Sequence, residues 1–160
     1  MKLCMSGAPQ HPASGRIMAL DVGQRRIGLA VSDALGWTAQ GLETLERASR
    51  RQDLEALMRL AAQWNVSLWL VGHPITLSGQ QGRQAQSVQR FAQDLTAYTG
   101  LPVELWDERL TTAQAQRVLK QSGVSIAKRA RAVDRLAAVL LLGSYLDRAT
   151  AARRKGGPLE

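Results

Sequence analysis

The sequence predicts a mixed α/β fold in which a β-hairpin is followed by alternating helices and strands. Two short apolar runs, at 17–22 and 27–32, are separated by a turn at 23–26, which indicates an antiparallel hairpin. Beyond it, segments with apolar residues at helical spacing alternate with short apolar runs. This order implies a mixed sheet, with an antiparallel start and parallel strands, that has helices on both faces.

Each later element has its own boundary signals. Ser49 is a suitable N-cap for the first helix, and Gly100 and Pro102 end the second. The elements expected after the hairpin are a short strand at 42–45, a helix at 49–64, a strand at 67–71, a helix at 79–99, a strand at 103–106, a helix at 111–121 and a strongly apolar helix at 133–146.

The length of 160 residues favours one domain. We expect a flexible leader at 1–15, a folded domain at 16–149 and a basic flexible tail at 150–160. No apolar run approaches the roughly 20 residues that a membrane-spanning helix needs. The single cysteine, Cys4, permits no internal disulfide and fits a reducing compartment.

The formal net charge is +8, with 21 basic and 13 acidic residues. Such a balance favours polyanionic partners, above all nucleic acid. Four of the positive charges lie near the C-terminus, at Arg148, Arg153, Arg154 and Lys155. Without these four, the rest of the chain is only modestly basic.

Acidic residues lie where three separate apolar elements begin or end. Asp21 is at the carboxyl end of the first strand, Asp107 and Glu108 end a later strand, and Asp134 is in the first turn of the last helix. Ligands of open α/β sheets collect at the carboxyl ends of strands, and carboxylates suit Mg²⁺ or Mn²⁺. Two such ions about 4 Å apart catalyse phosphodiester cleavage in many nucleases. For each acid taken alone, a structural role is the alternative.

Four motifs, in order, resemble those of the YqgF family, which comprises Holliday-junction resolvase-like proteins also described as pre-16S rRNA nucleases. The resemblance covers about residues 16–148. It implies an RNase H-like fold and a cytoplasmic nuclease. The matching segments are Ala-Leu-Asp-Val-Gly at 19–23 continued at 26–33, Val-Gly-His-Pro at 71–74, Asp-Glu-Arg-Leu-Thr-Thr at 107–112, and Asp134 with Ala137 and Ala138.

The resemblance also implies the catalytic residues. By position, Asp21 and Asp134 are metal ligands, and the middle motif offers Asp107 and Glu108. Adjacent strand residues point to opposite faces, so only one of these two is expected to enter the site. By analogy with the related resolvases, whose strand supplies a glutamate there, we favour Glu108. The expected cofactor is a pair of Mg²⁺ or Mn²⁺ ions.

The function implied is a metal-dependent nuclease, an endonuclease rather than an exonuclease, that hydrolyses structured nucleic acid and processes the 5′ end of pre-16S rRNA, as a monomer or homodimer. One alternative is a Holliday junction resolvase acting on four-way DNA, and another is a non-catalytic nucleic-acid-binding or ribosome-assembly factor. Two departures from the pattern bear on this choice. Ala137 stands where junction resolvases have a second acid, and His73 replaces the usual leucine.

Several cations are candidates for nucleic-acid contacts. Arg25, Arg26 and Arg109 are close to the acids in sequence, and the alternative for them is to hold the carboxylates in place. A further group precedes the expected last helix and has a solvated loop as its alternative; it comprises Lys128, Arg129 and Arg131. Of the four tryptophans, Trp37 is the candidate for stacking on an unpaired base, and Asp33 is expected to cap the turn before it.

Overall fold

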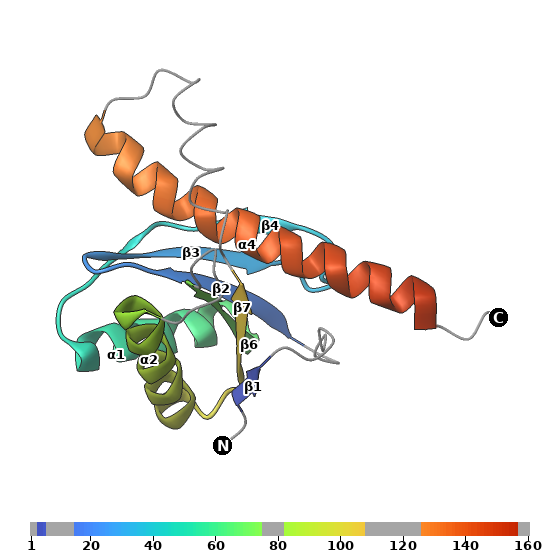
Figure 1. Ribbon diagram of the computed structural model, residues 1–160, viewed down its shortest axis with the longest axis horizontal. Helices are drawn as coiled ribbons and strands as arrows, with labels where there is room; N and C mark the ends of the chain where they lie inside the picture. Colours follow the sequence, from blue (N-terminus) through green and yellow to red (C-terminus); the bar gives the residue numbers. More distant parts are fainter. Residues whose placement is uncertain (1–2, 6–14, 75–81, 108–125, 157–160) are drawn as a thin grey trace.

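The computed structural model describes residues 3–5, 15–74, 82–107 and 126–156. These residues form a twisted sheet with helices on both faces (Figure 1), as the sequence predicts. The strands lie in the order β1 (Leu3–Met5), β7 (Val103–Asp107), β6 (Val66–His73), β2 (Arg16–Val22), β3 (Arg26–Ser32) and β4 (Ala39–Gly41), and β5 (Leu45–Glu46) also pairs with β3.

The sheet has a parallel half and an antiparallel half. Strands β1, β7, β6 and β2 run parallel to one another. β2 and β3 form the predicted antiparallel hairpin, and β4 and β5 run antiparallel to β3. The helices α1 (Arg50–Trp64) and α2 (Arg83–Thr99) cover one face, and the long helix α4 (Ile126–Gly156) crosses the other (Figure 1).

Alternation of side chains along the strands produces a separate apolar core on each face. On the α1/α2 face, Leu20 of β2 and Val71 of β6 pack in one cluster with Leu57 and Phe91 of the helices. On the α4 face, the members of the second cluster include Ile17, Ala19, Ala30, Leu70, Leu141 and Tyr145. Odd-numbered residues of β2 therefore point to α4, and this decides the orientation of Asp21.

The helix α1 begins as predicted. Ser49 is its N-cap, and it forms a capping box in which its hydroxyl accepts a hydrogen bond from the Gln52 amide. The helix ends at Asn65, whose φ of 53° is left-handed. The helix α2 begins at Arg83 rather than at 79, and residues 75–81 lie outside the described part. The predicted helix at 111–121 also lies outside it.

The predicted strand at 42–45 is wrong in its bounds, because two shorter strands, β4 and β5, flank this segment. Leu42 and Leu45 both pack against the α1/α2-side core. Residues three apart in a regular strand point to opposite faces. The chain must therefore bend between Leu42 and Leu45, which divides the strand.

Both chain ends contain more regular structure than expected. Within the predicted leader, Leu3–Met5 form β1 and pair with β7. Helix α4 begins before 133 and continues into the predicted tail, to Gly156, because alanine, arginine and lysine favour helix. The basic residues of its last turn also suit the negative end of the helix dipole. The assignment of 16–149 as the nuclease domain stays a prediction.

This end of α4 projects beyond the sheet (Figure 1). Among the helices that the structure describes, none has the length and apolarity needed to cross a membrane.

A glycine in β3 permits the closest contact between α4 and the sheet. A Cβ added to Gly28 would lie 2.0 Å from the carbonyl oxygen of Asp134, much closer than any real contact of this kind. Gly41 of β4 has a similar role, since a Cβ there would lie 2.7 Å from Cγ of Arg135. Glycine at these positions therefore lets the first part of α4 approach the backbone of β3 and β4.

We expect Gly28→Ala to lower the free energy of unfolding by about 1–3 kcal/mol, because the added methyl group overlaps Asp134. Gly143→Ala is the matched control. Gly143 lies in α4, the helix that contacts Gly28, and has nothing within 4 Å of an added Cβ. Gly143→Ala is therefore expected to raise stability by about 0.5–1 kcal/mol. Denaturant unfolding of both variants measures the difference. A Gly28→Ala protein as stable as wild type would contradict the close contact.

Candidate active site

Asp21 lies at the carboxyl end of β2, partly buried, on the face that α4 covers. In the antiparallel hairpin its partner is Gly28. On the other side, β2 and β6 pair up to Leu20 and Val71, and one further residue in this register sets Gly72 beside Asp21. Both neighbours in the sheet are therefore glycines, and neither covers the Asp21 carboxylate with a side chain.

Asp134 reaches the same place from α4. Its backbone lies directly over Gly28, and its Oδ2 accepts a hydrogen bond of 2.8 Å from Nε of Arg26. The side chains of this ion pair are 28% and 24% exposed. Asp21 and Asp134 thus both border Gly28 on one face of the sheet. For Arg26, the structure shows the role of carboxylate partner that was one of its two predicted roles.

Asp107 lies on the opposite face from Asp21. It is the last residue of β7 and pairs in register with His73 of β6, and both belong to the row that continues Val71 and Leu105 on the α1/α2 face. His73 is buried, with its Nε2 3.4 Å from Nε2 of Gln89. Burial lowers the pKa of His73, and the charge of Asp107 opposes this effect.

The remaining predicted site residues lie at the border of the described part or outside it. Arg25 is exposed in the hairpin turn. Glu108 and Arg109 lie outside the described residues. The backbone of α4 includes Lys128, Arg129 and Arg131, so the prediction that they precede the last helix is wrong, and their side chains are not described. Within the described residues, no three His, Cys, Asp or Glu side chains gather closely enough to hold a metal ion.

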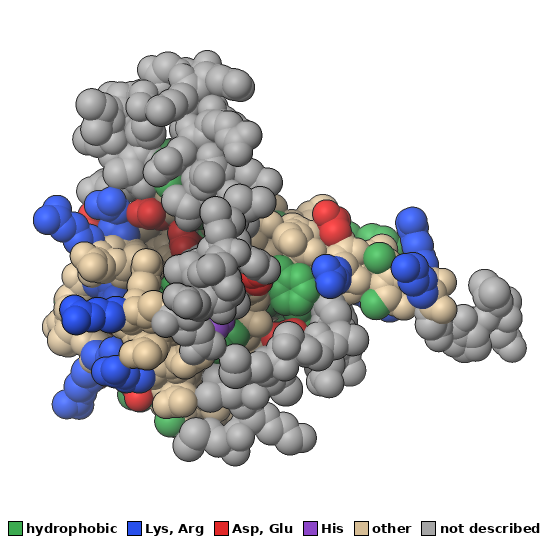
Figure 2. Space-filling view, viewed as in Figure 1, with side chains coloured by type: hydrophobic (Ala, Val, Ile, Leu, Met, Phe, Trp, Pro, Cys, Tyr) green, Lys and Arg blue, Asp and Glu red, His purple; other side chains and the backbone are tan. Residues whose placement is uncertain are grey.

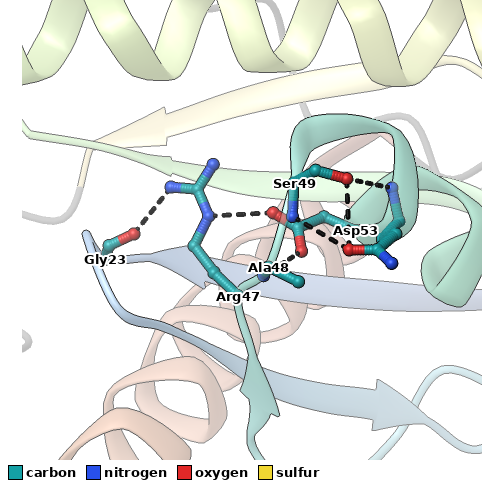
Figure 3. Close-up of polar contacts among 6 residues, drawn as sticks. Gly23, Arg47, Ala48, Ser49 and Asp53 are labelled. Atoms are coloured by element: carbon teal, nitrogen blue, oxygen red, sulfur yellow. Dashed lines mark hydrogen bonds and ion pairs between the residues drawn. The ribbon is translucent and has the colours of Figure 1, made fainter.

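A buried ion pair that sequence reasoning missed supports the turn after Asp21 (Figure 3). Arg47 donates from Nε to Oδ2 of Asp53 at 3.1 Å and from Nη1 to the carbonyl oxygen of Gly23 at 2.8 Å. The guanidinium also lies over the ring of Phe91. Asp53 belongs to the buried face of α1, and an acid within that apolar stripe was the available signal. The pair ties the hairpin turn to both helices.

A second buried polar contact anchors α4 to β7. The hydroxyl of Tyr145 donates to Oε2 of Glu104 at 2.9 Å, and the Tyr145 ring meets Trp106 edge to face, with 5.2 Å between centroids. Burial raises the pKa of Glu104, and the hydrogen bond from Tyr145 opposes the rise. This contact anchors the middle of α4 to the sheet, about three helical turns after Asp134.

Together, the antiparallel hairpin, the parallel strands and the long helix across the carboxylate-bearing face define an RNase H-like nuclease fold. The structure of Thermus thermophilus RuvC in complex with a Holliday junction substrate is similar, with a TM-score of 0.50 and 15% identity over 84% of this chain and 95% of that chain. The fowlpox virus resolvase with Holliday junction DNA has a TM-score of 0.50 and 16% identity over 82% of this chain and 97% of that chain. At these identities the likeness shows the fold alone.

The chain belongs to the RuvX family, whose model is described as Holliday junction resolvase and matches residues 15–148. A Koribacter versatilis relative named "Putative pre-16S rRNA nuclease" is 52% identical over 84% of this chain and 88% of its own length. A Symbiobacterium thermophilum protein of the same name is 47% identical over 86% of this chain and 95% of its own length. These findings confirm the family, fold and nuclease class predicted from the motifs.

The burial of Glu104 against Tyr145 predicts how the stability of the protein depends on pH. The pKa of Glu104 in the folded state is above the ordinary value of 4.5. The folded state therefore favours the protonated carboxyl, and stability is lost as the pH rises from 4.5 through the raised folded-state pKa. Glu104→Gln stays neutral and still accepts from Tyr145. We expect the stability of this variant relative to wild type to increase between pH 4 and neutrality in thermal unfolding. A Glu104→Gln difference that does not vary with pH would refute this.

Proposed function

We propose that this protein is a divalent-metal-dependent endonuclease that hydrolyses phosphodiester bonds in structured RNA, with the 5′ end of pre-16S rRNA as its substrate. The observation that carries the proposal is the meeting of Asp21 and Asp134 around Gly28, at the carboxyl end of a parallel strand. Ligands of open α/β sheets collect at that edge. The names of relatives at 47–52% identity support the choice of substrate.

The residues at this site fit a hard divalent cation. Carboxylate oxygens are the ligands that Mg²⁺ and Mn²⁺ prefer, and Gly28 beside Asp21 lets the Asp134 backbone lie against the sheet at this point. Arg26 orients Asp134 through one of its oxygens, as a supporting contact around a metal ligand would. The acids proposed as metal ligands are Asp21, Asp134 and Glu108, and the proposed ions are two Mg²⁺ or Mn²⁺.

Glu108 is proposed as the middle ligand because Asp107 faces the other way. Asp107 shares its face with His73, on the α1/α2 side, while Asp21 and Asp134 are on the α4 side. Successive residues of a strand alternate between faces, and this makes the residue after Asp107 the better candidate. Asp107 is then a neighbour of the site rather than a ligand.

The protein's own groups have three tasks in this scheme. The carboxylates hold the ions, which when bound lower the pKa of water and stabilise charge on the leaving oxygen. Arg26 keeps Asp134 in its orientation. Exposed Arg25, on the hairpin turn, contacts the substrate phosphates, and Arg109, Lys128, Arg129 and Arg131 are proposed for the same role from the sequence. In the reaction, water adds to phosphorus and the bond to the leaving oxygen breaks.

Resolution of four-way DNA junctions is the second candidate, favoured by the description of the family. Such a reaction cuts two symmetric strands and needs a dimer. Against it, Ala137 is 1% exposed, where junction resolvases have a second acid. Light scattering during size-exclusion chromatography, together with cleavage of matched RNA and four-way DNA substrates, separates the two. If the protein is a dimer that cuts only the four-way DNA junction, the proposed RNA nuclease function is wrong.

We expect Asp21→Asn, Glu108→Gln and Asp134→Asn each to reduce the cleavage rate by more than about 100-fold, because supporting residues around a metal alone cost 10–100-fold. Asp107→Asn is the matched control and is expected to retain most activity. Gel-based cleavage of precursor RNA measures the rates, and binding of the same RNA should survive. If Asp107→Asn is the inactive variant and Glu108→Gln is active, the assignment of the middle ligand is wrong.

Metal dependence has its own test. We expect a chelator to stop cleavage completely and added Mg²⁺ or Mn²⁺ to restore it, whereas Ca²⁺ supports binding without efficient turnover, because its looser coordination sphere does not align the reacting groups. Rates are measured on the wild-type protein across a titration of each ion. Full activity in excess chelator would contradict a metal-dependent mechanism.

A further inference from the structure

A second surface, about 20 Å along α4 from Asp134 at 1.5 Å per residue, has features that the proposed nuclease site does not use. It combines an exposed tryptophan, a groove beside β4 and the projecting basic end of α4. The far end of β3, which runs antiparallel to β2, leads into it. The surface therefore lies at the opposite end of the strands from Asp21.

The tryptophan is held by an ordered turn. The side chain of Asp33 accepts hydrogen bonds from the amides of Trp37 at 2.7 Å and Thr38 at 2.9 Å, which confirms its predicted role as the cap. Gly36, with a φ of 73°, closes the turn by donating to the Asp33 carbonyl. Even so, Trp37 is 64% exposed and Leu35 is 69% exposed. The backbone is thus fixed while the indole faces solvent.

An open groove begins next to this turn. Its walls come from Thr38 and Ala39 on one side and from α4 on the other, including Val139, Gly143 and Arg148. The only acidic residue among its described lining residues is Asp147. Most of the lining surface is apolar, and the groove extends along α4 to Arg148 and Ala151, next to the basic last turn of the helix.

The charge comes from the projecting end of α4. Arg153, Arg154 and Lys155 are all exposed in its last turn, and Arg148 stacks over Trp106 between them and the sheet. Figure 2 shows the basic side chains gathered on this projection. Four cations within eight positions of one helix favour a polyanion over an apolar peptide as the occupant.

We propose that Trp37, this groove and the basic end of α4 form a binding tract for a single-stranded segment of nucleic acid. Proteins that bind single strands combine a positively charged path for the backbone with aromatic side chains on which bases stack. A surface tryptophan can stack only on a base that is not inside a duplex. The inference rests on the proposed function in one respect, since it takes the segment to be an unpaired flank of the substrate.

The test measures binding of a labelled oligouridylate of about 12 nucleotides to the full chain by fluorescence anisotropy, with a chelator present so that no cleavage occurs. Trp37→Ser is expected to weaken binding about tenfold, from the loss of one stacked base, and Trp37→Phe to restore most of it. A duplex RNA of the same length should be insensitive to Trp37→Ser. Equal binding by wild type and Trp37→Ser would overturn the proposal.

A triple variant, Arg153→Gln, Arg154→Gln and Lys155→Gln, tests the charge. It should bind more weakly and lower the slope of log affinity against log salt by about 2, at roughly 0.7 per phosphate contact. The control removes the same charge from exposed arginines of α1 and α2 on the other face, at Arg59, Arg83 and Arg90. An equal loss in this control would mean that net charge alone acts, and the tract would be rejected.

The proposals of the binding tract and of the nuclease site can be refuted independently. On precursor RNA, tract variants should raise KM and leave kcat unchanged, whereas Asp21→Asn should abolish turnover and leave oligouridylate binding intact. Loss of turnover in Asp21→Asn with normal binding by both tract variants would refute the tract alone. Cleavage by Asp21→Asn at the wild-type rate would refute the nuclease site and leave the tract standing.

Discussion

The contact between α4 and β3 at Gly28 is the constraint on which the rest of the structure depends. Only a residue without a Cβ lets the Asp134 backbone lie against the strand, since an added Cβ would fall 2.0 Å from its carbonyl oxygen. Gly28 is also the register partner of Asp21. One close approach therefore brings Asp21 and Asp134, which are more than a hundred residues apart in the sequence, to the same glycine. It also fixes the position of the first part of α4 on the sheet.

The two faces of the sheet have different roles. On the α1/α2 face, apolar packing and the Arg47–Asp53 pair hold the hairpin turn in place. On the α4 face, the core stops short of the carboxyl edge, where Asp21 lies between glycines. The apolar clusters on the two faces therefore lie away from the carboxyl end of β2, where Asp21 is only partly buried.

Local signals predicted the elements with strong periodicity or a cap, such as the helix after Ser49 and the hairpin around Gly23. The motifs, by resemblance, predicted the fold and the candidate acids. Other features depend on tertiary contacts. The predicted strand at 42–45 is divided because Leu42 and Leu45 both pack on one core. The sequence left two possible roles for Arg26, and the structure shows its Nε 2.8 Å from Oδ2 of Asp134. Asp53 can be buried because Arg47 and the amide of Ala48, both from outside the helix, donate to its carboxylate.

The central claim is that Asp21 and Asp134 hold metal in one shared site. Calorimetric titration of Mn²⁺ into wild type, Asp21→Asn, Asp134→Asn and the double variant tests it most directly. We predict that each single change weakens Mn²⁺ binding at least about tenfold and that the double variant is non-additive, as for residues that share a partner. Unchanged affinity in either single variant, or strictly additive losses, would contradict a shared site.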